Sequence, residues 1–253
     1  MSGLPRSVHA LVTGGGRGIG RAIASALVGA GATVTVVGRH RATLDEAVAA
    51  GDSHFAEVAD VANQAAIGAA IAAAMERQPI DILIANAGIA ESAPFAKSDA
   101  ALFKRMIDVN LMGVVHVVQA ALPAMRDRPY GRIVAIASTA GLKGYAYVSA
   151  YSAAKHAAVG LVRSLALELA GTRVTVNAVC PGFTDTDLVA GSIDNIMTKT
   201  GRSRDQAIAE LSRYNPQGRL VNPAEVADSV LWLCGEGASA ITGQAIAVAG
   251  GEV

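Results

Sequence analysis

Short apolar runs alternate with longer, alanine-rich helical patterns along nearly the whole chain. Seven runs are rich in Val, Ile and Thr, as buried strands should be: Val8–Thr13, Thr33–Val37, His54–Val58, Ile80–Ala85, Gly131–Ala137, Val174–Val179 and Ala245–Val248. Helical patterns lie between them, at Ile19–Ala30, Ala42–Ala50, Asn63–Arg77, Ala100–Met125, Ala150–Ala170 and Pro223–Gly235. This alternation predicts an α/β fold, a doubly wound and mostly parallel seven-stranded sheet with helices on both faces.

Composition excludes several classes of protein. The hydrophobic share of 52% excludes a disordered chain, and equal counts of Lys+Arg and Asp+Glu, 21 each, argue against a nucleic-acid partner. Cys180 and Cys234 lie far apart and form no CxxC motif, so we expect neither a disulfide framework nor a bound metal. We find no signal-peptide pattern and no uninterrupted apolar span, and therefore expect a cytoplasmic protein with no membrane partner.

One segment interrupts the strand–helix rhythm. Residues 184–220 are too long for a simple connection and carry two helical patterns, Ser192–Lys199 and Arg204–Tyr214. Long excursions inside compact domains are often lids over binding sites, so we expect a helical lid here. An extra pair of packed helices fits the pattern equally well. The apolar lid residues suggest a partly apolar pocket, or pack inside the lid; they are Leu188, Val189, Ile193, Ile196 and Met197. No linker or change of composition divides the chain, so residues 1–253 are expected to form one domain.

A glycine-rich turn follows the first predicted strand and leads directly into a helix. It reads Thr13-Gly14-Gly15-Gly16-Arg17-Gly18-Ile19-Gly20. Glycines let the backbone approach a pyrophosphate, and the free N–H groups of the following helix N-terminus favour the same group. The turn therefore predicts a dinucleotide site, although its spacing, Gly-x-x-x-Gly-x-Gly, differs from the G-x-G-x-x-G fingerprint.

The end of the second predicted strand indicates which dinucleotide binds. NAD sites commonly place Asp or Glu there to accept from the ribose 2′-hydroxyl, but Gly38 stands at this position and Arg39 follows. Arg17 adds a second guanidinium, and two cations without an acid suit a 2′-phosphate. We therefore expect NADP in preference to NAD, unless Arg39 and Arg41 are only solvated loop residues.

A tyrosine and a lysine four residues apart, Tyr151 and Lys155, share one face of the helix predicted after the fifth strand. A free tyrosine titrates at about 10. The Lys155 ammonium, together with the positive nicotinamide of an oxidised cofactor, is expected to lower the Tyr151 pKa toward neutrality. Ser138 ends the preceding strand, at the edge where parallel sheets place their sites. Together with the glycine turn, these residues predict acid–base catalysis beside a dinucleotide.

These motifs and their order resemble the short-chain dehydrogenase/reductase family over essentially the whole chain, which implies a single catalytic domain of Rossmann type. Asp60-Val61 resembles the family's adenine-contacting pair, and Asn86-Ala87-Gly88 resembles its NAG element. The resemblance implies a cofactor site made of Gly14, Gly16, Arg17, Gly18, Ile19, Gly20, Arg39, Asp60, Val61, Asn86, Ala87, Gly88, Tyr151, Lys155, Pro181, Gly182, Thr184 and Thr186. Thr184 stands where members often carry Val or Ile.

The resemblance also implies a catalytic tetrad of Asn110, Ser138, Tyr151 and Lys155. In a reduction, Tyr151 would protonate the carbonyl oxygen that receives a hydrogen bond from Ser138, while the nicotinamide supplies hydride. Lys155 would bind the ribose hydroxyls, and Asn110 would hold a water that links Lys155 to solvent. The alternative for Asn110 is a structural role, in a helix kink or in hydrogen bonds to the backbone. Ser138, Tyr145 and Tyr151 are the expected substrate contacts.

Within the family, the segments around Ser138, Tyr151 and 177–183 resemble 3-oxoacyl-thioester reductases, which act on acyl-carrier-protein (ACP) or CoA esters, and polyketide ketoreductases. They imply an NADPH-dependent oxidoreductase (EC 1.1.1.-) that interconverts a carbonyl and a secondary alcohol. The first choice of substrate is a 3-oxoacyl thioester or polyketide-type ketone, a small molecule that CoA or a carrier protein could hold. Two alternatives stay open: an NAD-dependent secondary-alcohol or hydroxyacyl-CoA dehydrogenase, and a non-catalytic dinucleotide-binding scaffold.

The two longest helical patterns, Ala100–Met125 and Ala150–Ala170, are apolar on more than one face. The residues that exceed a single core-facing stripe are Leu111, Val114, Val115, Val118, Leu122, Ala153, Ala157, Leu161, Leu165 and Leu169. Exposed apolar faces of this size usually mark an interface. The resemblance implies that these helices pack across a two-fold axis and that Ile241–Val253 makes a second contact, so we expect a homotetramer. The competing interpretation is that the lid and neighbouring loops cover this face.

Overall fold

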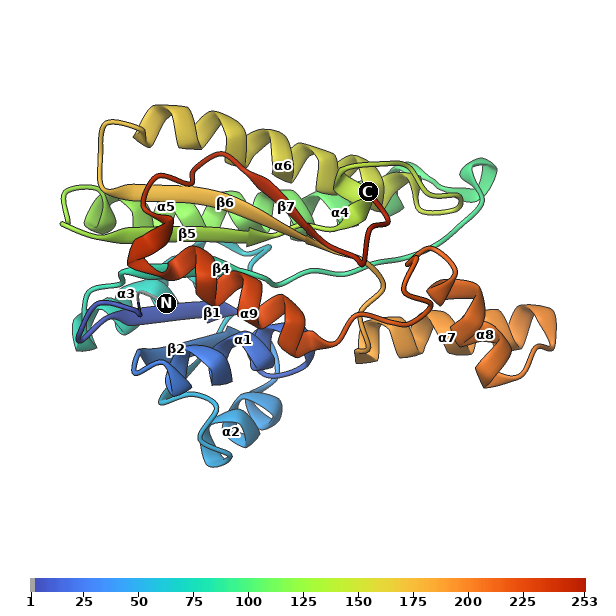
Figure 1. Cartoon of the computed structure of the whole chain (residues 1–253), viewed down its shortest axis with the longest axis horizontal. Coiled ribbons are helices and arrows are strands. Elements are labelled where there is room, and N and C mark those ends of the chain that lie inside the picture. Colours follow the sequence, from blue (N-terminus) through green and yellow to red (C-terminus); the bar gives the residue numbers. More distant parts are fainter. Residues whose placement is uncertain (1–2) are drawn as a thin grey trace.

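The computed structural model describes residues 3–253 and contains one seven-stranded sheet (Figure 1). The strands are β1 (His9–Thr13), β2 (Thr33–Gly38), β3 (Phe55–Val58), β4 (Ile82–Ala85), β5 (Gly131–Ile136), β6 (Val174–Pro181) and β7 (Ala245–Val248). Their spatial order is β3-β2-β1-β4-β5-β6-β7, and every neighbouring pair is parallel. The predicted doubly wound α/β fold is confirmed, and the sheet is parallel throughout rather than mostly so.

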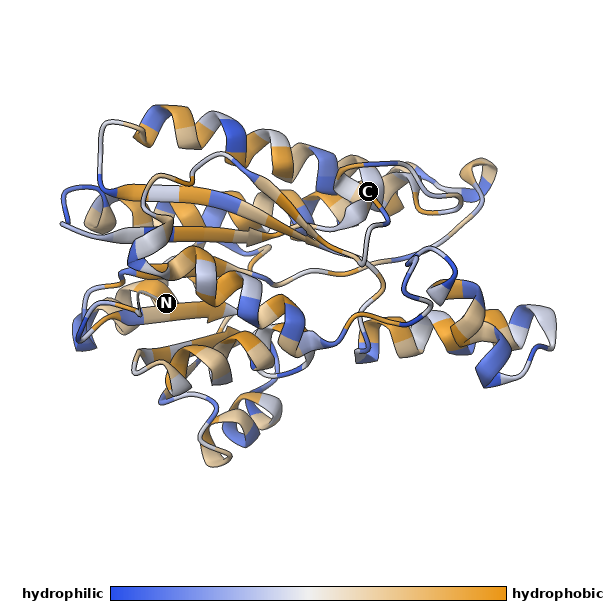
Figure 2. Ribbon diagram, viewed as in Figure 1, coloured by the Kyte–Doolittle hydropathy of each residue, from blue (hydrophilic) through white to orange (hydrophobic). Residues whose placement is uncertain are grey.

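Helices cover both faces of the sheet. They are α1 (Gly18–Gly29), α2 (Arg41–Ala49), α3 (Gln64–Arg77), α4 (Ala100–Ile107), α5 (Gly113–Met125), α6 (Ser149–Leu169), α7 (Asp187–Thr200), α8 (Arg204–Ser212) and α9 (Pro223–Cys234). One core lies between the sheet and α3, α5 and α6, and a second lies between the sheet and α1 and α9. Strand residues alternate between the two: Leu11 belongs to the first core, and its neighbours Ala10 and Val12 to the second. The strands are accordingly hydrophobic along their length (Figure 2).

The strand order reverses between β1 and β4, because the chain winds outward from β1 on one side and from β4 on the other. In open parallel sheets a ligand binds beyond the carboxyl ends of the strands at such a switch point. The glycine turn after β1 and the Asn86 segment after β4 both start at this point. The topology therefore brings together two motifs that lie about 70 residues apart in the sequence.

The predicted helix Ala100–Met125 is continuous but not regular. A π-helical turn, Asp108–Met112, separates α4 from α5 and contains the buried Asn110. By length and composition alone, Ala100–Met125 is apolar enough to cross a membrane, which the sequence prediction did not anticipate; no other helix among residues 3–253 passes this test. One face of the stretch belongs to the core beside α3, through residues such as Val117.

The segment 184–220 forms the helix pair α7 and α8, which projects from the body of the molecule (Figure 1). Helix α7 begins at Asp187, five residues before the predicted start at Ser192, because Thr186 already adopts an extended N-cap conformation. The pair has its own apolar cluster, built around Val189, Ile193, Ala207 and Leu211. Val189 and Ile193, two apolar residues of the expected lid, therefore stabilise the pair internally.

Candidate active site

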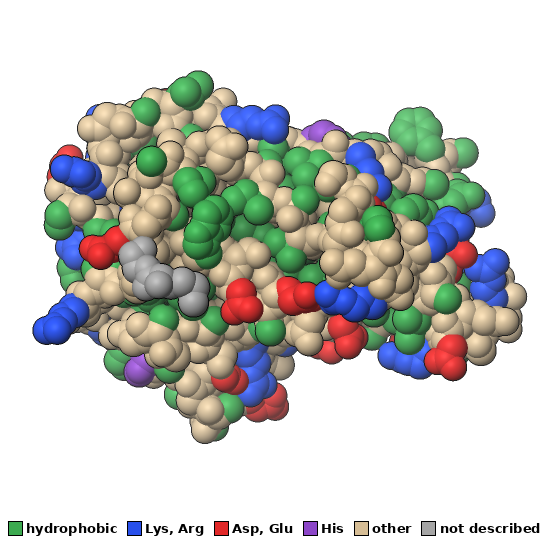
Figure 3. All heavy atoms as spheres, viewed as in Figure 1, with side chains coloured by type: hydrophobic (Ala, Val, Ile, Leu, Met, Phe, Trp, Pro, Cys, Tyr) green, Lys and Arg blue, Asp and Glu red, His purple; other side chains and the backbone are tan. Residues whose placement is uncertain are grey.

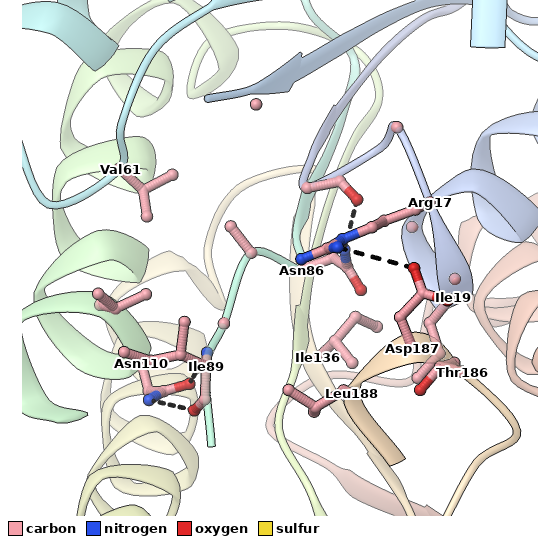
Figure 4. Close-up of a pocket in the computed structure, with 18 of the residues that line it drawn as sticks. Arg17, Ile19, Val61, Asn86, Ile89, Asn110, Ile136, Thr186, Asp187 and Leu188 are labelled. Atoms are coloured by element: carbon pink, nitrogen blue, oxygen red, sulfur yellow. Dashed lines mark hydrogen bonds and ion pairs between the residues drawn. The ribbon is translucent and has the colours of Figure 1, made fainter. Parts of the chain in front are cut away.

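A cavity lies at the carboxyl ends of the strands, between the sheet and the start of α7 (Figure 4). Every residue that the sequence predicted to bind the cofactor lines this cavity, and so do all four predicted catalytic residues. The segments that follow β1, β2, β4, β5 and β6 each contribute to it. Residues from Gly14 to Val189 thus face a single space.

The glycine turn is shaped for close backbone approach. Gly14 has φ +65°, and a Cβ there would lie 2.9 Å from the amide nitrogen of Asn86 and 3.0 Å from the Cα of Ala87. Helix α1 begins at Gly18 with no acidic residue in its first turn. Its free N–H groups and positive dipole end can therefore receive a pyrophosphate, so this cradle fits a dinucleotide.

The segment after β4 supports the glycine turn through hydrogen bonds. The Asn86 side-chain amide donates to the backbone carbonyls of Thr13, at 2.9 Å, and Gly14, at 3.3 Å. In return, the backbone N–H groups of Asn86 and Ala87 donate to the Thr13 hydroxyl at 3.0 and 3.1 Å. These bonds fix the shape of the cradle before any ligand binds.

Two guanidinium groups line the cavity near β2, and each lies close to a carboxylate. Arg39 lies there, 4.0 Å from the carboxylate of Asp60, and both side chains are about half exposed. Arg17 reaches across the cavity to Asp187 at the start of α7, 3.6 Å away (Figure 4). No carboxylate stands at position 38, so both guanidinium groups can reach a phosphate once one arrives.

The predicted catalytic side chains meet on the other side of the cavity. Ser138 follows β5, and Tyr151 and Lys155 lie in the first turns of α6. The Lys155 ammonium donates to the carbonyl of Ile136 at 2.8 Å and lies 5.7 Å from the centre of the Tyr151 ring. The cavity therefore presents a phenol, a hydroxyl and an ammonium beside the dinucleotide cradle.

Burial dominates the protonation of these groups. It raises the pKa of Tyr151 above its ordinary value, and a hydrogen bond with Ser138 opposes that rise. Burial also lowers the pKa of Lys155 to about 8. In the protein alone, burial outweighs the hydrogen bond with Ser138, so the Tyr151 pKa does not fall. The lowering expected from Lys155 together with the oxidised cofactor stays a prediction.

The model of the short chain dehydrogenase family matches residues 8–197 of the chain. The chain belongs to the short-chain dehydrogenase/reductase family. It is 41% identical over 249 residues to a Streptomyces coelicolor protein that carries a ketoacyl reductase name, covering 96% of this chain and 95% of that one. It is 36% identical over 243 residues to the 3-oxoacyl-(acyl-carrier-protein) reductase MabA of Mycobacterium tuberculosis, covering 95% and 91%.

A solved relative has the same fold. The crystal structure of an actinorhodin polyketide ketoreductase variant with NADPH superposes with a TM-score of 0.91 at 40% identity, covering 97% of each chain. The short-chain dehydrogenase/reductase family consists of oxidoreductases, so the chain is an enzyme of this class, close in sequence to ketoacyl reductases.

In this short-chain dehydrogenase/reductase, Asn110 makes the backbone contacts that the alternative interpretation required. Its amide nitrogen donates to the carbonyls of Ile89 and Met106, each at 3.0 Å, and its oxygen accepts from the Ile89 N–H at 3.2 Å. The π-helical turn and these bonds tie the start of α5 to the loop after β4 (Figure 4). The water-holding role of Asn110 stays a prediction.

Tyr145, the third predicted substrate contact, does not line the cavity. Its hydroxyl is hydrogen-bonded to Thr139 and to the carboxylate of Glu252 instead, and burial raises its pKa. Tyr145 therefore cannot offer a free hydroxyl to a substrate in this arrangement.

Sequence reasoning missed His40, Thr43 and Ile89, which line the cavity. His40 and Thr43 follow Arg39 closely, so the strand end that predicted the cofactor could also have revealed them. Ile89 carries no motif, and only the fold shows that it faces the cavity. Leu188 and Val189, apolar residues of the expected lid, also line the cavity.

Proposed function

We propose that this enzyme uses NADPH to reduce the ketone of a 3-oxoacyl thioester or a polyketide-type intermediate to a secondary alcohol. The observation that carries the proposal is the group of Ser138, Tyr151 and Lys155 beside the dinucleotide cradle, in a chain whose relatives are named for ketoacyl reduction. The relative of known structure was crystallised with NADPH, which supports the same cofactor here.

The residues of the site divide the chemistry between them. The dinucleotide, when bound, supplies a hydride to the carbonyl carbon. Tyr151 gives its proton to the carbonyl oxygen, which becomes the hydroxyl of the product. Ser138 donates a hydrogen bond to the same oxygen as negative charge develops on it. Lys155, between Tyr151 and the cradle, holds the ribose hydroxyls of the cofactor.

Burial raises the pKa of Tyr151 in the protein alone, so the phenol carries the proton that reduction requires. The shift does not set the direction of the reaction, because Tyr151 gives up this proton in reduction and takes it back in oxidation.

A substrate panel tests the proposal. Acetoacetyl-CoA, a free 3-oxoacid ester, a cyclic diketone and simple secondary alcohols would be assayed with NADPH and NADH in both directions. We expect the highest kcat/KM for the 3-oxoacyl thioester with NADPH. Fastest turnover of a secondary alcohol with NAD would favour the dehydrogenase alternative, and no turnover with tight NADPH binding would favour the scaffold.

Arg39→Ala is expected to weaken NADPH binding much more than NADH binding. Loss of a charge-assisted contact with the 2′-phosphate reduces affinity by about ten- to a hundredfold. Fluorescence titration with each cofactor measures the change. Arg41→Ala is the matched control, because Arg41 pairs with Asp45 on α2 and does not line the cavity. Equal kcat/KM with NADH and NADPH in the unmutated enzyme would contradict the preference.

We also propose a cytoplasmic homotetramer. Leu167, on the outer face of α6, is 80% exposed, and Trp232 on α9 is 52% exposed. Hydrophobic side chains also gather over α9 and β7 (Figure 3). Of the apolar residues that the sequence placed at an interface, Val114, Val118 and Leu169 are core residues, while the others are at least partly exposed. We propose that the outer face of α6 and the face over α9 and β7 each pack against the same face of another subunit. Two isologous contacts of this kind give a tetramer.

Sedimentation equilibrium at micromolar concentration tests the tetramer. A single species of four times the 25.6 kDa chain mass is expected, and Trp232→Glu should reduce it to a dimer by placing a charge in the second interface. A monomer would defeat the proposal, while a dimer of the unmutated chain would refute only the interface at α9 and β7.

A further inference from the structure

The side chain of Glu252, in the segment after β7, is buried beside the loop that follows Ser138. It is 1% exposed, and its Oε1 lies 3.1 Å from the ammonium of Lys143. The same ammonium donates to the backbone carbonyl of Glu252 at 3.2 Å. A buried carboxylate is stable only when it is paired, and Lys143 supplies the pairing charge.

A second bond links Glu252 to the start of the same loop. The Tyr145 hydroxyl is hydrogen-bonded to the Glu252 carboxylate and, at 2.6 Å, to the hydroxyl of Thr139. The carboxylate can only accept, so Tyr145 gives it its one proton, and Thr139 provides the proton of the other bond. Thr139 is buried and directly follows Ser138. Glu252 thus reaches the neighbour of a catalytic residue through one tyrosine.

Hydrogen bonds within the loop connect Thr139 and its neighbours to Ser138. Residues 139–141 form a single helical turn, whose Ala140 N–H donates to the Ser138 hydroxyl oxygen at 3.1 Å. The Gly141 N–H donates to the Ser138 carbonyl at 2.8 Å. A shift of this turn therefore moves the hydroxyl that stabilises the substrate oxygen.

Glu252 also contacts the cofactor side of the cavity. A Cβ at Gly182 would lie 3.1 Å from Glu252 Oε2, so the carboxylate lies directly against the segment after β6. The Tyr145 ring packs edge-on against Phe183, with centroids 6.0 Å apart, and against Tyr214 at 5.4 Å. Glu252 therefore lies where the loop after Ser138, the segment after β6 and the base of the lid meet.

We propose that Glu252 is a positioning residue, which acts through Lys143, Tyr145 and Thr139 to hold Ser138 in its reactive place. Catalytic groups must be fixed to within about half an ångström, and a displacement of about 1 Å can reduce the rate a hundredfold. The inference rests on the reductase function proposed above. It assigns a structural role to the Tyr145 hydroxyl, which links Glu252 to Thr139.

Glu252→Gln tests the proposal, because it removes the charge and keeps the size of the side chain. We expect kcat for ketone reduction to fall by roughly ten- to a hundredfold, with KM changed much less, since Ser138 acts on the developing charge. The affinity and stoichiometry of NADPH binding should stay within twofold, which excludes a loss of folded enzyme. Glu76→Gln, an exposed residue on α3, is the matched control and should leave kcat unchanged.

Three further variants, at Lys143 and Tyr145, separate charge from packing. Lys143→Arg keeps the cation and should retain most of the turnover, whereas Lys143→Met should lose about as much as Glu252→Gln. Tyr145→Phe keeps the ring contacts and removes only the hydroxyl, so it should lower kcat in the same way. If Glu252→Gln does not fold, these three substitutions still decide the question.

Hydrogen exchange provides a measurement that needs no substrate. Amides of residues 139–147 should exchange faster in Glu252→Gln, while those of the glycine turn should not change. Unchanged exchange together with unchanged kcat would overturn the proposal. Faster exchange in a protein that reduces no ketone would support the positioning role and defeat the proposed function instead.

Discussion

Tyr151→Phe is expected to abolish ketone reduction while leaving cofactor binding nearly intact. Phenylalanine keeps the ring in place and removes only the proton donor. The Lys155 ammonium is the other ionisable group beside Tyr151; it lies 5.7 Å from the centre of the ring and donates to the Ile136 carbonyl. The loss should therefore reach at least the roughly 10²- to 10⁴-fold typical of general acid–base catalysis.

Stopped assays with a 3-oxoacyl thioester give kcat, and NADPH fluorescence gives the dissociation constant. Tyr130→Phe is the control, because the Tyr130 hydroxyl donates to the Cys234 carbonyl, away from the cavity. Its turnover should stay close to that of the unmutated enzyme. Substantial turnover of Tyr151→Phe would mean that another group supplies the proton.

The central strands were predictable because they are apolar runs buried on both faces, such as β4 (Ile82–Ala85) and β5 (Gly131–Ile136). Their ends were less predictable. The fourth strand begins at Ile82 rather than Ile80, because the side chain of Asp81 accepts from the His9 N–H and the Arg128 guanidinium. Those partners come from distant segments, and no local pattern reveals them.

The grouping of the predicted cofactor and catalytic residues around one cavity was predictable because their spacing reflects backbone geometry. A Gly turn between a strand and a helix, and a Tyr and Lys one helical turn apart, lie at the same edge of the sheet in any chain of this fold. The bonds of Tyr145 were not predictable, because its position depends on Glu252, 107 residues later, and on the rings of Phe183 and Tyr214. The rise of the Tyr151 pKa in the protein alone was not predictable either, because burial is a property of the folded chain.

Lys155→Met is expected to abolish turnover and weaken cofactor binding, yet to raise the stability of the protein at neutral pH. Burial lowers the Lys155 pKa from 10.5 to about 8. A shift of this size means that keeping the buried ammonium charged lowers the free energy of unfolding by about 3 kcal/mol. Methionine has a similar length and no charge, but it leaves the Ile136 carbonyl without this donor, which costs about 1–3 kcal/mol.

The pKa of Lys155 also predicts how the stability difference between the two proteins changes with pH. Below about pH 8, Lys155 is charged in both the folded and the unfolded chain, and the full burial penalty applies. Between about pH 8 and 10.5 the folded chain releases its proton first, so the unfolded chain binds more protons and stability rises with pH. The advantage of Lys155→Met over the unmutated enzyme should therefore be largest at pH 7 and shrink toward pH 10.

Thermal unfolding of both proteins from pH 6 to pH 10 measures the difference. A net gain of about 1 kcal/mol would raise the unfolding midpoint by about 2–4 °C for a chain of this size. Lys104→Met is the control, because Lys104 is exposed and its pairing with Asp108 contributes at most about 1 kcal/mol. A less stable Lys155→Met at pH 7 would show that the ammonium supports the fold. A more stable but inactive variant would show that the enzyme keeps a destabilising buried charge because Lys155 must hold the ribose beside Tyr151.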